Sequence, residues 1–269
     1  MENAVTFEKS TFQKRLGSMM KVDFRRMFKS RLFYIILACA LLIPVLMTVM
    51  MAMMDGTVSV NPQTGEESIM VGPENTWQNI GTLPGGEGMG GSDVFMMCNI
   101  NMAFMGVAVF ICLFISEDFR SGYAKNLFTV RAKKGDYVIS KTIAGFVCGA
   151  LMLILYLIGS MLGGAAAGLS FDLYGLNAGN IVMCMLAKIF LMFVFAAIDV
   201  LVSVAAKQKA WLCLCGSLGV CMLFFMTVSM ITPLGSTFLH AVLCFAGGAL
   251  FAAGLGAISK TVLVKTSLV

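Results

Sequence analysis

Long apolar runs alternate with short polar segments along this sequence. Six stretches of about 18 or more residues carry almost no charge, and each could cross the roughly 30 Å hydrocarbon core of a bilayer as an α-helix. The predicted spans are residues 32–54, 94–116, 142–164, 180–206, 211–231 and 237–258. This pattern predicts an all-α, polytopic membrane protein with six transmembrane helices.

A second periodicity precedes the first span. Apolar residues recur there every three or four positions, and basic residues lie between them. This is typical of an amphipathic helix on a membrane surface, although a basic segment also serves as a plain topology signal. We expect a cytoplasmic N-terminal segment (1–31) with such a helix, followed by a transmembrane domain (32–269). The apolar positions are Leu16, Met19, Met20, Met27, Phe28 and Leu32, and the basic ones are Lys21, Arg25, Arg26 and Lys29.

Composition and charge agree with this reading and add an orientation. Apolar residues make up 59% of the chain and charged residues only 12%, unlike an ordinary soluble domain. All but one of the 19 Lys and Arg residues lie before the first span, between spans two and three, between spans four and five, or after the sixth. Cytoplasmic loops carry such an excess, so both termini are predicted to be cytoplasmic and the acidic loop 55–93 extracellular.

The net charge of +5 does not indicate nucleic-acid binding, because the basic residues lie within reach of anionic lipid headgroups. The segment 86–91 satisfies G-x-G-x-x-G but lies in a loop without the strand and helix that a dinucleotide site needs. One histidine, His240, and one intramembrane carboxylate, Asp199, do not form a catalytic constellation. All nine cysteines fall in apolar segments, so we expect them to be buried apolar side chains and not metal ligands. Together these observations predict no catalytic residue, metal or cofactor.

The second cytoplasmic loop, 117–141, is too charged and patterned to be a simple connection. Apolar residues such as Leu127 and Phe128 interrupt its charges. A short helix there would offer both apolar and charged groups, which suits docking to a soluble partner. We expect Asp136 to cap a helix that begins at Tyr137 and becomes the third span.

These features resemble the membrane permease subunits of ABC-2-type ABC transporters, particularly the small peptide and lantibiotic-immunity permeases of Gram-positive bacteria. Those proteins have a basic interfacial helix, six spans and both ends inside. Their second cytoplasmic loop has a glutamate, a glycine, a Lys-Asn pair, further basic residues and a lysine that opens the third span. The corresponding residues here are Glu117, Gly122, Lys125, Asn126, Arg131, Lys133, Lys134 and Lys141, with Arg120 in the same segment.

The resemblance implies that this loop binds a separate ATP-hydrolysing subunit, and that ATP binding moves the loop and its spans. The chain itself would catalyse nothing and would form the export pathway for a peptide or amphiphilic compound. It would act as two copies, or with a related permease, in a bacterial cell membrane. A secondary transporter or channel, a membrane scaffold and an intramembrane enzyme are the alternatives.

Two charged residues lie inside the predicted fourth span, Lys188 and Asp199. A charge at the bilayer centre costs at least about 2.5 to 3.5 kcal/mol on insertion scales. The two residues share a helix face but lie roughly 16 Å apart, so they cannot pair with each other. Each must face the bundle interior, a partner or water, either in the pathway or an interface or as a structural hydrogen-bonding group. Asn99 and Asn101 are weaker candidates of the same kind.

Overall fold

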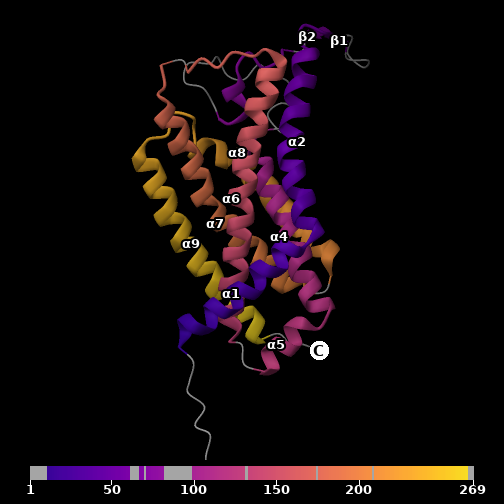
Figure 1. Ribbon diagram of the computed structural model, residues 1–269, viewed down its shortest axis with the longest axis vertical. Coiled ribbons are helices and arrows are strands. Elements are labelled where there is room, and N and C mark those ends of the chain that lie inside the picture. Colours follow the sequence, from indigo (N-terminus) through magenta and orange to yellow (C-terminus); the bar gives the residue numbers. More distant parts are fainter. Residues whose placement is uncertain are drawn as a thin grey trace, which may run out of the picture.

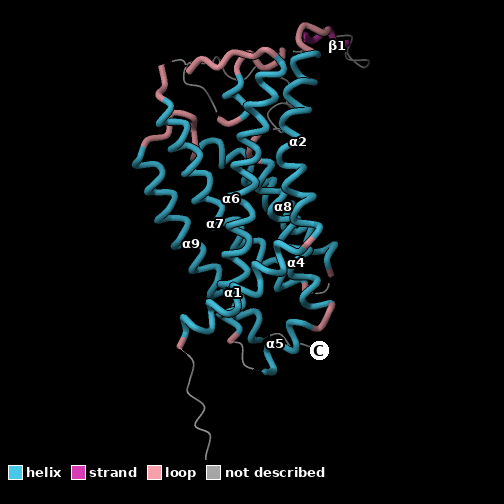
Figure 2. Tube along the Cα trace, viewed as in Figure 1, coloured by secondary structure: helices cyan, strands magenta, loops and turns pink. Residues whose placement is uncertain are grey.

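Long helices lie side by side in the computed structural model (Figures 1 and 2). Five of them have the length and apolar composition to cross a membrane, which agrees with the predicted helical membrane protein. They are α2 (Arg31–Met53), α4 (Met102–Arg120), α6 (Lys134–Ala167), α7 (Ala178–Ala206) and α9 (Phe238–Lys265). The structure describes residues 11–60, 67–69, 71–81, 99–130, 133–173, 175–207 and 209–265; Arg131 and the segment 86–91 lie outside them.

The helix α8 (Ala210–Ile231) occupies the predicted fifth span. Its apolar stretch Ala210–Phe225 is shorter than the five long helices, so the sixth crossing stays a prediction. The helix α6 has 34 residues, about 51 Å at 1.5 Å per residue. That length exceeds the roughly 30 Å core of a bilayer, so α6 extends beyond any span that it forms.

The predicted basic helix is present as α1 (Phe12–Lys29). It lies obliquely across one end of the bundle and packs mainly on α6 (Figure 1). Met19 and Met27 are buried against the bundle, whereas Phe28 is about half exposed. Because Ser30 alone separates α1 from α2, the chain turns sharply between them. The position of α1 at a membrane surface stays a prediction.

Small residues bring the helices close together. A Cβ atom on Gly159 of α6 would clash with the carbonyl oxygen of Leu41 on α2, and one on Gly163 would lie 3.0 Å from the Cα of Val45. Glycines at such contacts let two backbones approach, as is common between membrane helices. The pair α2 and α6 is accordingly among the most extensive in the bundle, together with α7 and α9.

The two ends of the bundle differ. One end carries the antiparallel hairpin of β1 (Val58–Val60) and β2 (Glu67–Ile69) and the short helix η1 (Thr76–Asn79). There Trp77 donates a hydrogen bond to the carbonyl oxygen of Phe171 at 3.0 Å, and Asn79 donates one to Thr48 of α2 at 2.9 Å. The opposite end, which we call the α5 end, carries α1, the short helix α5 (Tyr123–Val130) and the end of α9 (Figure 1).

Candidate functional site

The segment 117–141 is mostly helical. Glu117 and Arg120 belong to the last turns of α4, and α6 already begins at Lys134. Between them Gly122 adopts φ +73°, a left-handed conformation that glycine reaches without strain, and the chain turns there into α5. The predicted loop is therefore shorter than expected, and it contains the short helix that its pattern suggested.

The expected capping role of Asp136 is wrong. The residue at the N-terminal cap of α6 is Lys133, which makes no side-chain cap hydrogen bond. Asp136 lies in the first turn of α6 and accepts a hydrogen bond from Nε of Arg15 at 3.1 Å. An ion pair with α1 thus replaces the cap, and α6 begins before Tyr137.

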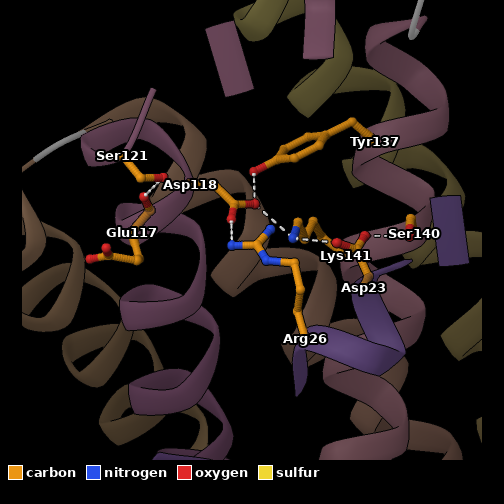
Figure 3. Close-up of polar contacts among 8 residues, drawn as sticks. All are labelled: Asp23, Arg26, Glu117, Asp118, Ser121, Tyr137, Ser140 and Lys141. Carbon is orange, nitrogen blue, oxygen red and sulfur yellow. Dashed lines mark hydrogen bonds and ion pairs between the residues drawn. The ribbon is translucent and has the colours of Figure 1, made fainter. Parts of the chain in front are cut away.

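Asp118, at the end of α4, is completely buried and contacts two other helices. The Tyr137 hydroxyl donates a hydrogen bond to Oδ2 of Asp118 at 3.0 Å, and Nζ of Lys141 lies 2.7 Å from the same oxygen. The guanidinium of Arg26 on α1 forms an ion pair with Oδ1 at 2.5 Å (Figure 3). This one carboxylate therefore joins α4 to both α1 and α6.

A second buried carboxylate completes the arrangement. Nζ of Lys141 lies 2.8 Å from Oδ1 of Asp23 on α1, and Ser140 donates a hydrogen bond to Oδ2 of Asp23 at 2.6 Å (Figure 3). Two carboxylates thus face one ammonium and one guanidinium, and their charges balance, as buried ion pairs require. We call the six residues the charge network: Asp23, Arg26, Asp118, Tyr137, Ser140 and Lys141.

Aromatic rings connect the charge network to α5. The guanidinium of Arg26 lies 4.3 Å from the ring centroid of Tyr123, and Nζ of Lys141 lies 4.0 Å from that of Phe114. Such cation–π contacts are stronger where water is excluded. Partial burial alone would lower the pKa of Arg26, but the adjacent Asp118 raises that pKa above its ordinary value, so the guanidinium stays charged. At the other end of α5, the Phe128 ring lies 5.3 Å from that of Tyr137.

The described residues that were predicted to touch an ATPase differ in their exposure. Lys141 is 2% exposed and belongs to the charge network, so it is not on the surface. Lys134 is half-buried and donates a hydrogen bond to the carbonyl oxygen of Leu263 on α9 at 2.7 Å. The Glu117 carboxylate points away from the charge network (Figure 3). The exposed members are Glu117, Arg120, Lys125, Asn126 and Lys133.

Nearer the hairpin end, Lys188 is completely buried among polar groups. Its Nζ lies 3.1 Å from Oδ1 of Asn101, the residue that precedes α4, and 2.8 Å from Oγ1 of Thr232, the residue that follows α8. Asn101 in turn donates a hydrogen bond to Ser229 at 2.7 Å, and its backbone N–H donates to Asn99. Among the described residues Lys188 forms no ion pair, so this cluster holds an uncompensated cation.

Asp199 lies in a separate cluster and is also completely buried. Neither of its carboxylate oxygens has a hydrogen-bond partner among the described residues. The Ser203 hydroxyl donates to the backbone carbonyl of Asp199 at 2.6 Å and lies 3.0 Å from Sγ of Cys213 on α8. As expected, the side chains of Lys188 and Asp199 do not pair with each other.

The sequence analysis identified only Lys141 among the members of the charge network as a candidate. One signal was available for Asp23, because it is the only acidic residue in the basic helix α1. No comparable signal distinguishes Asp118 from its neighbour Glu117, since only the fold decides which carboxylate turns inward.

No known protein family, curated protein or solved structure matches this chain. Within the part of the chain that the structure describes, no group of three or more His, Cys, Asp and Glu side chains is arranged to hold a metal ion. The fold is that of a helical membrane protein with a buried charge network at one end.

Proposed function

We propose that this chain is the membrane permease subunit of an ATP-driven ABC exporter. In this proposal it crosses the membrane six times, with the α5 end in the cytoplasm, and α5 docks on a separate ATPase subunit. The exported molecule is a peptide or another amphiphilic compound. The permease acts as a homodimer or with a related permease in a bacterial cell membrane.

The observation that carries the proposal is the position of α5. Its exposed residues Lys125 and Asn126 belong to the pattern that resembles the ABC-2-type permeases. Its other side is held against the bundle through Tyr123, Phe128 and the buried Ala124. A short helix with one exposed polar face and one anchored face suits docking to a soluble partner.

The charge network supplies a physical route for coupling. A displacement of α5 acts on the end of α4 at Asp118 and on Tyr137 of α6 through Phe128. Because Asp118 binds Arg26 and Lys141 together, α1, α4 and α6 would move as one unit. Buried ion pairs resist separation, since stranding one partner costs about 3 to 5 kcal/mol.

Co-purification tests the proposal. The detergent-solubilised protein, isolated from its native membranes, should bring with it an ATPase subunit identified by mass spectrometry. The variant Lys125→Glu with Asn126→Arg should lose that subunit, because it puts an acidic side chain at position 125, moves the positive charge to position 126 and adds bulk to the exposed face of α5. Lys209→Glu is the matched control, because Lys209 is an exposed lysine outside α5.

A photo-crosslinking amino acid at position 126 gives a second readout and should join the chain to the same ATPase. If the wild type brings no ATPase and forms no crosslink, the permease proposal fails. A secondary transporter, a channel or a membrane scaffold would then be the better reading. Equal loss of the ATPase in the Lys209→Glu control would show that general charge, not α5, holds the partner.

A further inference from the structure

A pocket of about 510 Å³ opens beside the charge network, between α1, the start of α2 and the end of α4. Its polar lining comes mainly from α1 and includes Arg25, Arg26, Lys29 and the following Ser30. The volume lies within the range of about 300 to 1,000 Å³ that is usual for small-molecule sites.

The charges of the pocket are only partly compensated. The charge of Arg26 is compensated by its ion pair with Asp118. Arg25 and Lys29 are exposed and form no ion pair with another described residue. Among the described residues of the lining, Glu117 is the single acidic one. The pocket therefore has a net positive charge, which suits a ligand that carries a single negative charge.

The remaining wall of the pocket is apolar. Leu32 lies in the first turn of α2, and Leu113 and Phe114 lie two turns before the end of α4. At these positions the apolar parts of α2 and α4 end and the charged α5 end begins. In a membrane, this is the depth at which lipid headgroups would meet the acyl chains. A small soluble anion gains nothing from contact with an apolar wall, whereas the acyl chains of a lipid can pack against it.

We propose that this pocket binds the phosphate group of an anionic phospholipid. Arginine presents N–H groups in a fork that matches phosphate oxygens, and the exposed side chains of Arg25 and Lys29 provide the donors. The acyl chains leave along Leu32 and Leu113 into the membrane. A lipid bound there contacts α1 and α4 together, because residues of both helices line the pocket.

The test uses the full chain purified in a neutral detergent. Phosphatidylglycerol is titrated against it, with zwitterionic phosphatidylcholine and inorganic phosphate in parallel, and binding is followed by native mass spectrometry and by the midpoint of thermal unfolding. The pocket variant is Arg25→Gln with Lys29→Gln, neither of which belongs to the charge network. The matched control is Lys14→Gln with Lys21→Gln, which removes the same charge from exposed positions of α1 outside the pocket.

We expect saturable binding of phosphatidylglycerol to the wild type, with a rise in the unfolding midpoint. The pocket variant should bind about tenfold more weakly or worse, the loss expected when a charge-assisted hydrogen bond is removed, and the control should bind as the wild type does. A photoactivatable phosphatidylglycerol should label the segment that contains Arg25 and Lys29 in the wild type, which tests the pocket without any variant.

Three results would overturn the proposal. Equal weakening in the control variant would indicate general attraction to basic residues rather than a pocket. Phosphatidylcholine binding as tightly as phosphatidylglycerol would remove the role of the charge. Inorganic phosphate acting at the same concentrations as the lipid would show a site for free phosphate instead.

Discussion

The ammonium of Lys141 lies 2.7 Å from a carboxylate oxygen of Asp118, and both side chains are almost completely buried. The bundle contains a second buried lysine, Lys188, whose hydrogen-bond partners are the neutral Asn101 and Thr232. Two lysines with the same burial thus have opposite electrostatic surroundings. This difference makes their substitution informative.

Replacing Lys141 with methionine should destabilise the protein by about 3 to 5 kcal/mol, because Asp23 and Asp118 would then face each other without the ammonium between them. Lys188→Met should lie within about 1 kcal/mol of the wild type or be stabilising, because it removes an uncompensated buried charge and keeps the volume. Unfolding by sodium dodecyl sulfate in mixed micelles measures both. Equal losses would mean that the ion pairs contribute nothing specific.

Asp199→Asn should leave stability within about 1 kcal/mol of the wild type. An ionised carboxylate without a donor costs several kcal/mol, so the neutral acid is the form that fits this site, and an amide has nearly the same shape. Asp199→Lys places an unpaired ammonium there and should prevent accumulation of folded protein. Size-exclusion profiles report folding, and transport by the folded Asn variant then separates a pathway role from a structural one.

Gly159→Ala and Gly247→Ala should have opposite effects on stability. A methyl group at Gly159 meets the backbone of α2, which cannot yield easily, and overpacking of this kind costs about 1 to 3 kcal/mol. At Gly247 of α9 nothing lies within 4 Å of the added carbon, and alanine favours a helix by about 0.5 to 1 kcal/mol. The same unfolding titration distinguishes them. A loss of stability at Gly247 would place a partner helix against α9.

The proposed orientation predicts the behaviour of reporter fusions in a bacterial host. Green fluorescent protein at the C-terminus should fluoresce, because that end is expected in the cytoplasm. Alkaline phosphatase inserted after Leu173, near the hairpin end, should be active because that end is expected outside. A dark C-terminal fusion in correctly inserted protein would contradict the assignment of the α5 end.

The positions of the long helices could be predicted because each depends on local apolarity alone. The start of α6 could not, because Lys134, Asp136 and Lys141 give its first turns the composition of a loop. Those charges are tolerated in a helix since each has a partner from elsewhere in the chain. Periodicity along one segment carries no information about such partners.

The same limit applies to the candidate site. The segment around α5 could be found from its charges, and Lys188 and Asp199 from their cost in a membrane. The inward turn of Asp118 and Arg26 depends on how α1 crosses α4, which no spacing within either helix reveals. Lys141 was predicted to contact the partner subunit. The sequence did not reveal that its side chain is buried.

The charge network also sets an order of events during synthesis. Asp23 and its partner Lys141 are 118 residues apart in the chain. At about 5 to 20 residues per second, roughly 6 to 24 s pass between the translation of one and the other. Through that interval Asp23 lacks Lys141, and burying it without a partner would be costly. The helix α1 therefore reaches its final place only after the beginning of α6 has been synthesised.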